Sequence, residues 1–270
     1  MRLTKHITFK SDNQIWRLKL NEIDDLLIEI RDTSTKEVSY NIINIPSKKT
    51  ITNYINLPDN IFLGFEAFYS NFIFFHKFVK PDLPMHLGIF TFDINVGKII
   101  WENLDYNFLL INNNSLIAQK QGFDENILVE LDLLTGNFIQ SLSLSLDEID
   151  EMHNGFMSKY NFDLYGYPEE IMLTDYEIIN NVIEKYTKSF PLKYNPQLLI
   201  YEDLFLSNFH LLTNKGITNY FVAVNNKGRI VEEIILNKSV NAFVPESFFT
   251  YKNYLILLKE KSELLIYKME

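Results

Sequence analysis

The segment from His76 to His86 gathers the side chains in this sequence that are best suited to chemistry. It carries two imidazoles, the Lys80 ammonium and the Asp82 carboxylate, and two prolines restrict its backbone. A lysine suits an anionic group, and a nearby carboxylate can help to orient that group. Rigid polar loops on a β scaffold commonly carry binding residues. We therefore predict a loop with His76, Lys80, Asp82 and His86 as candidate ligand contacts.

An ordinary structural turn is the alternative for this segment. In that case Asp82 caps the turn, and the two imidazoles are hydrogen-bonded within the protein or solvated. A metal site made from the same residues is conceivable, with His76, His86 and either Glu66 or Asp82 as ligands. However, the spacing fits no zinc motif, and the chain contains no cysteine. We therefore expect neither a metal nor another cofactor, and we keep Glu66 as a candidate contact.

The two tryptophans are the remaining candidate contacts. Trp16 and Trp101 each lie in an expected strand beside a charged residue, Arg17 and Glu102 respectively. Indole rings at the mouth of a channel can stack on planar ligands, whereas buried indoles anchor the packing of sheets. Anchoring is the more common role of such residues, so we favour it while keeping both tryptophans as candidates.

Recognised catalytic motifs are absent from the sequence. It contains no glycine-rich phosphate loop, nucleophile elbow, zincin or Ser-His-Asp motif. The acidic clusters Asp124-Glu125 and Asp147–Glu151 are typical of a turn and of a helix start, and they lack EF-hand spacing. A non-catalytic module that binds a small molecule or a protein is therefore our first hypothesis. An enzyme acting on a polar small molecule, such as a sugar or nucleotide derivative, through residues 76–86 is the second.

The amino-acid composition limits the fold classes and the binding partners that fit this sequence. The 270 residues are 47% hydrophobic and 14% aromatic, which allows a large core and favours strands. A formal net charge of -10 argues against binding to nucleic acid or to anionic membranes. We find neither a signal peptide at the N-terminus nor the run of about 20 apolar residues that a membrane span needs. We expect a cytoplasmic protein, and the sequence leaves its oligomeric state open.

Strand patterns fill the chain on both sides of one interruption. Phe72–Phe75 is apolar on both faces, which predicts a strand packed between two layers. The strand pattern stops at residues 147–190, where Thr174 and Glu177 have the spacing of a capping box that opens a helix. We predict one domain over residues 1–270, with this interruption as a helical insert packed on the β body.

A repeated hairpin gives the β pattern its period. Phe92–Ile100 matches Leu131–Ile139 position for position, and each copy has an Asp before the turn and a Gly within it. The copies are about 40 residues apart, and such a period with about four strands indicates a β-propeller. Weaker copies lie at Ile30–Val38, Val224–Val231 and Lys259–Ile266. We predict an all-β fold, a β-propeller of about five blades. A β-sandwich with long hairpins explains the matching turns less well.

The first copy of the repeat carries a family resemblance. Ile89–Glu102 resembles the repeat of quinoprotein-like propellers, in which an aliphatic residue and Asp precede a Thr-Gly-Lys turn and a Trp follows. Val96 replaces the Thr here and Trp101 is kept, whereas the second copy has Thr135 but carries Gln140 at the Trp position. This resemblance implies propeller architecture and does not imply a quinone cofactor.

A second resemblance covers most of the chain. His76–Gly88, followed by Gly97-Lys98 and Trp101–Asn103, is similar to the signature of a bacterial family of domains of unknown function. Ile15–Leu18 and Phe248–Tyr267 fit that family as well. The family has no assigned activity, so the resemblance implies a fold and supplies no reaction.

Overall fold

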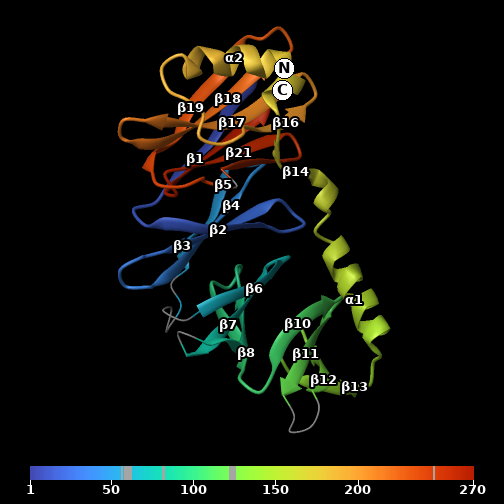
Figure 1. Ribbon diagram of the computed structural model, residues 1–270. Coiled ribbons are helices and arrows are strands. Elements are labelled where there is room, and N and C mark those ends of the chain that lie inside the picture. Colours follow the sequence, from blue (N-terminus) through green and yellow to red (C-terminus); the bar gives the residue numbers. More distant parts are fainter. Residues whose placement is uncertain (56, 58–62, 81–82, 122–125, 246) are drawn as a thin grey trace. The chain divides into compact units, whose positions relative to one another are not determined.

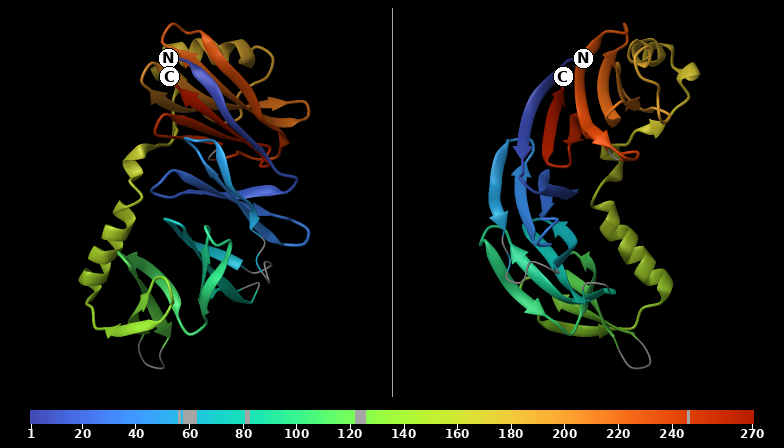
Figure 2. Two further views of the ribbon diagram at one scale, coloured as in Figure 1. Left: turned by 180° about the vertical axis from the view of Figure 1, so that it is seen from behind. Right: turned by 60° about the vertical axis from the view of Figure 1, so that its left-hand side comes forward.

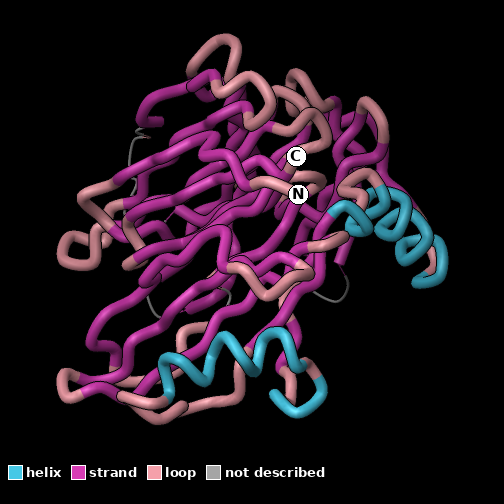
Figure 3. The backbone as a smooth tube through the Cα atoms, turned by 90° about the horizontal axis from the view of Figure 1, so that it is seen from above, coloured by secondary structure: helices cyan, strands magenta, loops and turns pink. Residues whose placement is uncertain are grey.

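The described part of the chain is built mainly from β-strands (Figure 3). A computed structural model describes residues 1–55, 57, 63–80, 83–121, 126–245 and 247–270. Within these residues, 22 strands form five antiparallel sheets, and two α-helices accompany them (Figure 1). The predicted all-β class is therefore confirmed. No helix in these residues is long and apolar enough to cross a bilayer.

The chain divides into two compact units. The contiguous unit is Asn13–Phe162, and the split unit combines Met1–Asp12 with Asp163–Glu270. Each unit contains buried apolar clusters of its own, so each has its own core.

Three four-stranded sheets make up the contiguous unit, and the strands of each sheet follow one another in chain order. The first sheet contains β2 (Gln14–Leu20), β3 (Asp25–Arg31), β4 (Val38–Asn44) and β5 (Lys49–Ile55). The second contains β6 (Leu63–Tyr69), β7 (Phe72–Lys80), β8 (Leu83–Asp93) and β9 (Lys98–Asn103). The third contains β10 (Asn107–Asn112), β11 (Ser115–Gln121), β12 (Asn126–Asp132) and β13 (Phe138–Leu142). Helix α1 (Leu146–Ser158) packs against β10.

Strand β7 is packed on both faces, as its fully apolar start predicts. Ile73 and Phe75 belong to one buried cluster, together with Tyr40 of β4. Phe74, whose side chain points to the opposite face, belongs to another cluster with Leu110 of β10. The second sheet is therefore covered on one side by the first sheet and on the other by the third.

Two five-stranded sheets make up the split unit. In the order of pairing, one contains β1 (Leu3–Lys10), β22 (Glu263–Met269), β21 (Tyr254–Lys259), β20 (Phe248–Tyr251) and β14 (Tyr165–Gly166). The other contains β15 (Glu169–Glu170), β16 (Gln197–Tyr201), β17 (Leu204–Thr213), β18 (Gly216–Asn225) and β19 (Ile230–Val240). Because β1 pairs with β22, the first and last strands are neighbours (Figure 2).

The segment 147–190 contains more than helix and contributes to both units. Helix α1 lies in the contiguous unit, whereas α2 (Glu177–Thr187) lies in the split unit, where it buries Ile179, Val182 and Ile183. Two 3₁₀ turns and the short strands β14 and β15 lie between the two helices.

The capping box predicted at Thr174 and Glu177 is wrong. Thr174 lies inside a 3₁₀ turn, where its hydroxyl donates to Asp175. Tyr176 therefore occupies the N-cap position of α2, and its side chain makes no capping hydrogen bond. The capping box of this segment belongs to α1 instead, where Ser145 and Glu148 cap each other's backbone N–H groups.

The two matching hairpins form the same turn. The Gly97 N–H donates to the Asp93 carbonyl at 2.7 Å, and the Gly136 N–H donates to the Asp132 carbonyl at 2.8 Å. Both glycines have positive φ, at 74° and 68°, which the missing Cβ permits. Each Asp side chain also accepts N–H groups from the two residues ahead of that glycine. Both turns join the third strand of a sheet to the fourth, so the repeat corresponds to one structural unit.

A backbone bulge also recurs in the contiguous unit. The first strand of each of its sheets carries one extra residue relative to the second strand. The bulged residues are Trp16 in β2, Glu66 in β6 and Leu109 in β10. A bulge redirects the side chain that it carries. The same irregularity therefore redirects the Trp16 indole in the first sheet, the Glu66 carboxylate in the second and the Leu109 side chain in the third.

Candidate functional site

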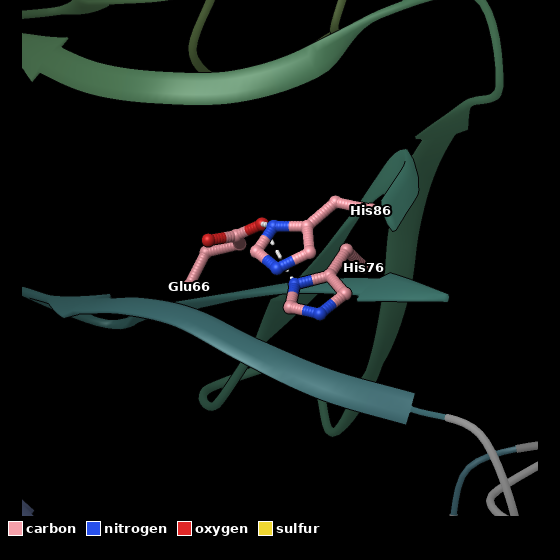
Figure 4. A group of neighbouring side chains, drawn as sticks. All are labelled: Glu66, His76 and His86. Carbon is pink, nitrogen blue, oxygen red and sulfur yellow. Dashed lines mark hydrogen bonds and ion pairs between the residues drawn. The ribbon is translucent and has the colours of Figure 1, made fainter. Parts of the chain in front are cut away.

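Glu66, His76 and His86 meet on the second sheet of the contiguous unit (Figure 4). The Nδ1 atoms of His76 and His86 both lie 2.7 Å from the same oxygen, Glu66 Oε1. The two imidazole rings are stacked, with 3.5 Å between their centroids and an angle of 9° between their planes. We call these three residues the triad.

Three adjacent strands position the triad. Phe65 pairs with Phe75 and Ala67 pairs with Phe74, which leaves Glu66 as the bulged residue of β6. His76 follows Phe75 on β7 and pairs with Gly64 on β6. The carboxylate and the first imidazole are therefore close because of the bulge, although they are 10 positions apart in sequence.

His86 reaches the other two residues from β8. It pairs with Phe78, which is two residues beyond His76 on β7 and therefore on the same face of the sheet. The Phe78 ring is nearly perpendicular to both imidazoles, at centroid distances of 4.8 Å from His76 and 5.9 Å from His86. This aromatic ring forms an apolar wall beside the stacked pair.

Gly64 provides the space that the His76 imidazole occupies. A Cβ at position 64 would overlap the Nε2 and Cε1 atoms of that ring. The imidazole therefore lies directly on the β6 backbone, which restricts its movement. Any side chain larger than hydrogen at position 64 has to displace His76.

Burial differs across the triad. His76 is 3% exposed, whereas the His86 side chain is 43% exposed and opens the site to solvent. Burial by itself would raise the pKa of the Glu66 carboxyl, but the close contacts and charges of His76 and His86 outweigh it. The pKa of Glu66 is therefore held below its ordinary value, and the carboxylate is the form that the site favours.

The buried imidazole is poorly satisfied. Neither ring nitrogen of His76 has an aligned hydrogen-bond partner among the residues that the structure describes. Its Nδ1 contacts Glu66 at 2.7 Å without the alignment of a hydrogen bond, and Nε2 lies over Gly64. A buried polar atom without a partner is costly, so this ring has unused capacity to bind.

The predicted loop between His76 and His86 is wrong. Strand β7 continues to Lys80 and strand β8 begins at Leu83, with Lys80 paired to Leu83. Pro84 is compatible with this part of β8, because the pairing of β8 with β9 begins only at Ile89. The edge of β8 that faces β9 therefore needs no backbone N–H donor at this point. The Lys80 side chain and Asp82, both candidate contacts, lie outside the described part of the chain.

The tryptophans lie apart from the triad. Trp101 is 8% exposed, and its indole N–H donates to the Leu133 carbonyl at 3.0 Å. Its ring also covers Gly136, so it connects the second sheet to the third. Trp16 is 52% exposed and lies under the Arg31 guanidinium, 4.7 Å from its ring centroid.

An ion cluster around the buried Glu29 was not predicted from the sequence. Glu29 of β3 is fully enclosed; Arg31 Nε donates to its Oε1 at 2.6 Å, and Arg17 Nε lies 3.6 Å from its Oε2. Burial, and then the Glu29 charge, raise the pKa of Tyr40 in the same cluster. The available signal was a lone Glu within the apolar strand Leu26–Ile30. Paired in this way, the cluster is an internal ion pair of the first sheet.

Residues 21–101 match the model of a domain family described as a domain of unknown function, DUF4905. That stretch includes all three triad residues. The chain matches no curated protein.

Three solved structures are similar to the chain at low identity. A member of the DUF4221 family from Bacteroides vulgatus is 10% identical, with 100% of this chain and 98% of that chain covered and a TM-score of 0.32. Hsv2 of Kluyveromyces lactis is 11% identical, with 95% and 75% covered and a TM-score of 0.32. An uncharacterised protein of Listeria monocytogenes is 9% identical, with 94% and 67% covered and a TM-score of 0.33. The match of residues 21–101 to the DUF4905 model, and not these structures, confirms the expected resemblance to a family of domains of unknown function.

Proposed function

We propose that this protein is a non-catalytic ligand-binding β-propeller of about five blades, and that the triad is its binding site. The five antiparallel sheets support the propeller, since three of them have the four strands of a blade and the other two have five. The pairing of β1 with β22 is a further support, because a propeller closes its ring when chain ends share one blade.

One observation carries the binding site: two imidazoles share a single carboxylate oxygen while one of them faces solvent. The buried pair of Glu66 and His76 is fixed by the bulge and by Gly64. The exposed His86 offers a route by which a ligand can reach them. Ligand sites commonly combine a few convergent polar groups with apolar walls, and Phe78 supplies such a wall here.

A binding role is favoured over a catalytic one because the sequence lacks the catalytic motifs discussed above. One observation supports the alternative that the protein is an enzyme. A carboxylate that contacts an imidazole is an arrangement used in acid–base catalysis, and Glu66 with His86 has this geometry at 2.7 Å. The substrate class for that alternative is a polar small molecule.

The test is a screen of polar small molecules by thermal shift, on the full chain with EDTA present throughout. We expect a ligand that raises the melting temperature of the wild type and of His153→Ala, an exposed histidine outside the triad. The same ligand should leave Glu66→Gln and His86→Ala unshifted. Ligands that stabilise all four proteins equally would contradict the proposal. Product formation that requires Glu66 would establish the enzyme alternative instead.

A further inference from the structure

We infer that the triad binds a divalent first-row transition-metal ion such as Zn²⁺. The inference rests on the proposed function, because it specifies the ligand that the same site takes. One ligand atom from each of Glu66, His76 and His86 lies within 4.8 Å of the other two. Two imidazole nitrogens and a carboxylate oxygen form a ligand set that suits Zn²⁺ and its neighbours in the first row.

The buried imidazole points to a ligand independently of this clustering. His76 is almost completely buried, and neither of its nitrogens has an aligned hydrogen bond within the described chain. A histidine kept for structure alone would be expected to donate to a carbonyl or carboxylate and to accept from a donor. A metal ion at Nδ1 would use the lone pair that the protein leaves unsatisfied.

Two of the three ligands of the proposed metal site, Glu66 and His76, are already held in place. Gly64 and the β6 bulge hold His76 and Glu66, whose facing atoms are 2.7 Å apart. Ligand atoms on a tetrahedral Zn²⁺ are about 3.4 Å apart, so these atoms have to separate by about 0.7 Å. Glu66 can make such a shift by a small rotation of its carboxylate.

His86 is the movable ligand. In the stacked pair the ring planes are nearly parallel and the ring centroids are 3.5 Å apart, so their lone pairs do not converge on one point. One ring has to turn before both can face the same ion. His86 has the space to turn because its side chain is 43% exposed, whereas His76 is confined. Metal binding should therefore unstack the two imidazoles.

Three protein ligands leave a coordination position open. Zinc sites with three protein ligands keep a water or a substrate atom in the fourth position. Because the His86 side chain is 43% exposed, solvent and small molecules can reach such a position here. An oxygen or nitrogen atom of a small molecule can bind there, which links the metal to the proposed role in ligand binding.

The test is titration of the full chain with Zn²⁺ by calorimetry, after treatment with EDTA and its removal. Co²⁺ serves as a second probe, because its visible absorption reports coordination number and nitrogen ligation. We expect one ion per chain for the wild type and for His153→Gln. We expect affinity to fall by about 100-fold or more in His86→Gln and in Glu66→Gln. Circular dichroism checks that the variants remain folded, and His86→Gln is an exposed change that the fold should tolerate.

Two outcomes would overturn the metal site. One is binding of Zn²⁺ that is equally tight in the wild type and in the two triad variants. The other is a Co²⁺ spectrum of a fully hydrated ion at saturating protein. The thermal-shift screen in EDTA separates this inference from the proposed function. If a small molecule binds to the triad in EDTA but the titration shows no metal binding, the metal site is overturned and the proposed function stands. Failure of both experiments overturns both claims.

Discussion

The His76 imidazole rests on the backbone of Gly64, in the volume where any other residue would place its Cβ. Gly64→Ala should therefore push the ring out of its position and disturb the triad. We expect the free energy of unfolding to fall by about 1–3 kcal/mol, the usual cost of overpacking a core. The measurement is urea unfolding followed by tryptophan fluorescence. It reports the contiguous unit, because Trp16 and Trp101 both lie in it.

Gly155→Ala is the matched control for this change. Gly155 lies within α1 in the same unit, and a Cβ there meets nothing within 4 Å. Alanine favours helix over glycine, so this variant should gain about 0.5–1 kcal/mol. Equal stabilities of the two alanine variants would contradict the role assigned to Gly64.

Trp101→Phe should destabilise the contiguous unit by about 2–3 kcal/mol. The substitution removes the donor of the 3.0 Å hydrogen bond to the Leu133 carbonyl and leaves that buried acceptor without a partner. It also leaves space above Gly136, which the indole covers. Circular dichroism during urea unfolding measures the effect. Trp16→Phe, at a half-exposed position, should change stability by no more than about 0.5 kcal/mol.

Ser145→Ala should cost about 1 kcal/mol, because it removes the side-chain acceptor that caps the Glu148 N–H at the start of α1. Thr174→Ala is the informative comparison, since Thr174 has the sequence spacing of a capping box but caps no helix. Its effect should stay within about 0.5 kcal/mol. Chemical denaturation of both variants, side by side, checks the assignment. A larger loss in Thr174→Ala would contradict it.

The split unit should lose stability as the pH falls from about 6.5 towards 4. Burial lowers the pKa of His210 to about 4, and its Nε2 accepts the Val244 N–H at 3.2 Å. Between this value and the ordinary pKa of 6.5, the unfolded chain binds a proton that the folded chain does not. The free energy of unfolding of the split unit therefore decreases as the pH falls through this range.

His210→Gln removes this titration while keeping an acceptor for the Val244 N–H. Amide hydrogen exchange in β17, measured from pH 6.5 to pH 4.5 after correction for intrinsic rates, follows the split unit directly. The wild type should lose more protection than the variant over this range, by at most about 3 kcal/mol in opening free energy. Parallel losses in the two proteins would rule out His210 as the cause.

Features that depend on local chemistry could be predicted from the sequence. The turns at Asp93 and Asp132 follow from an Asp that accepts nearby N–H groups and a Gly that adopts positive φ. The burial of β7 on both faces follows from four consecutive apolar residues. In each case the residues that determine the structure are within a few positions of one another.

Features that depend on register could not be predicted in the same way. Glu66 meets His76 only because one extra residue in β6 redirects its side chain. Two prolines near His86 suggested a loop, yet an unpaired strand edge accommodates Pro84 as well. Thr174 had correct capping spacing, but the preceding 3₁₀ turn shifted the N-cap to Tyr176. In all three cases neighbouring backbone decided between two conformations that the local sequence allows.

The pairing of β1 with β22 determines an order of folding during synthesis. The contiguous unit can complete its three sheets once Phe162 has left the ribosome, because all their strands have then been made. Strand β1 emerges before any of them, but its partner Glu263–Met269 is translated after all of them. Until that partner is made β1 is an unpaired strand, and its Lys5 and Lys10 are residues of the kind that keep such strands from pairing with other chains.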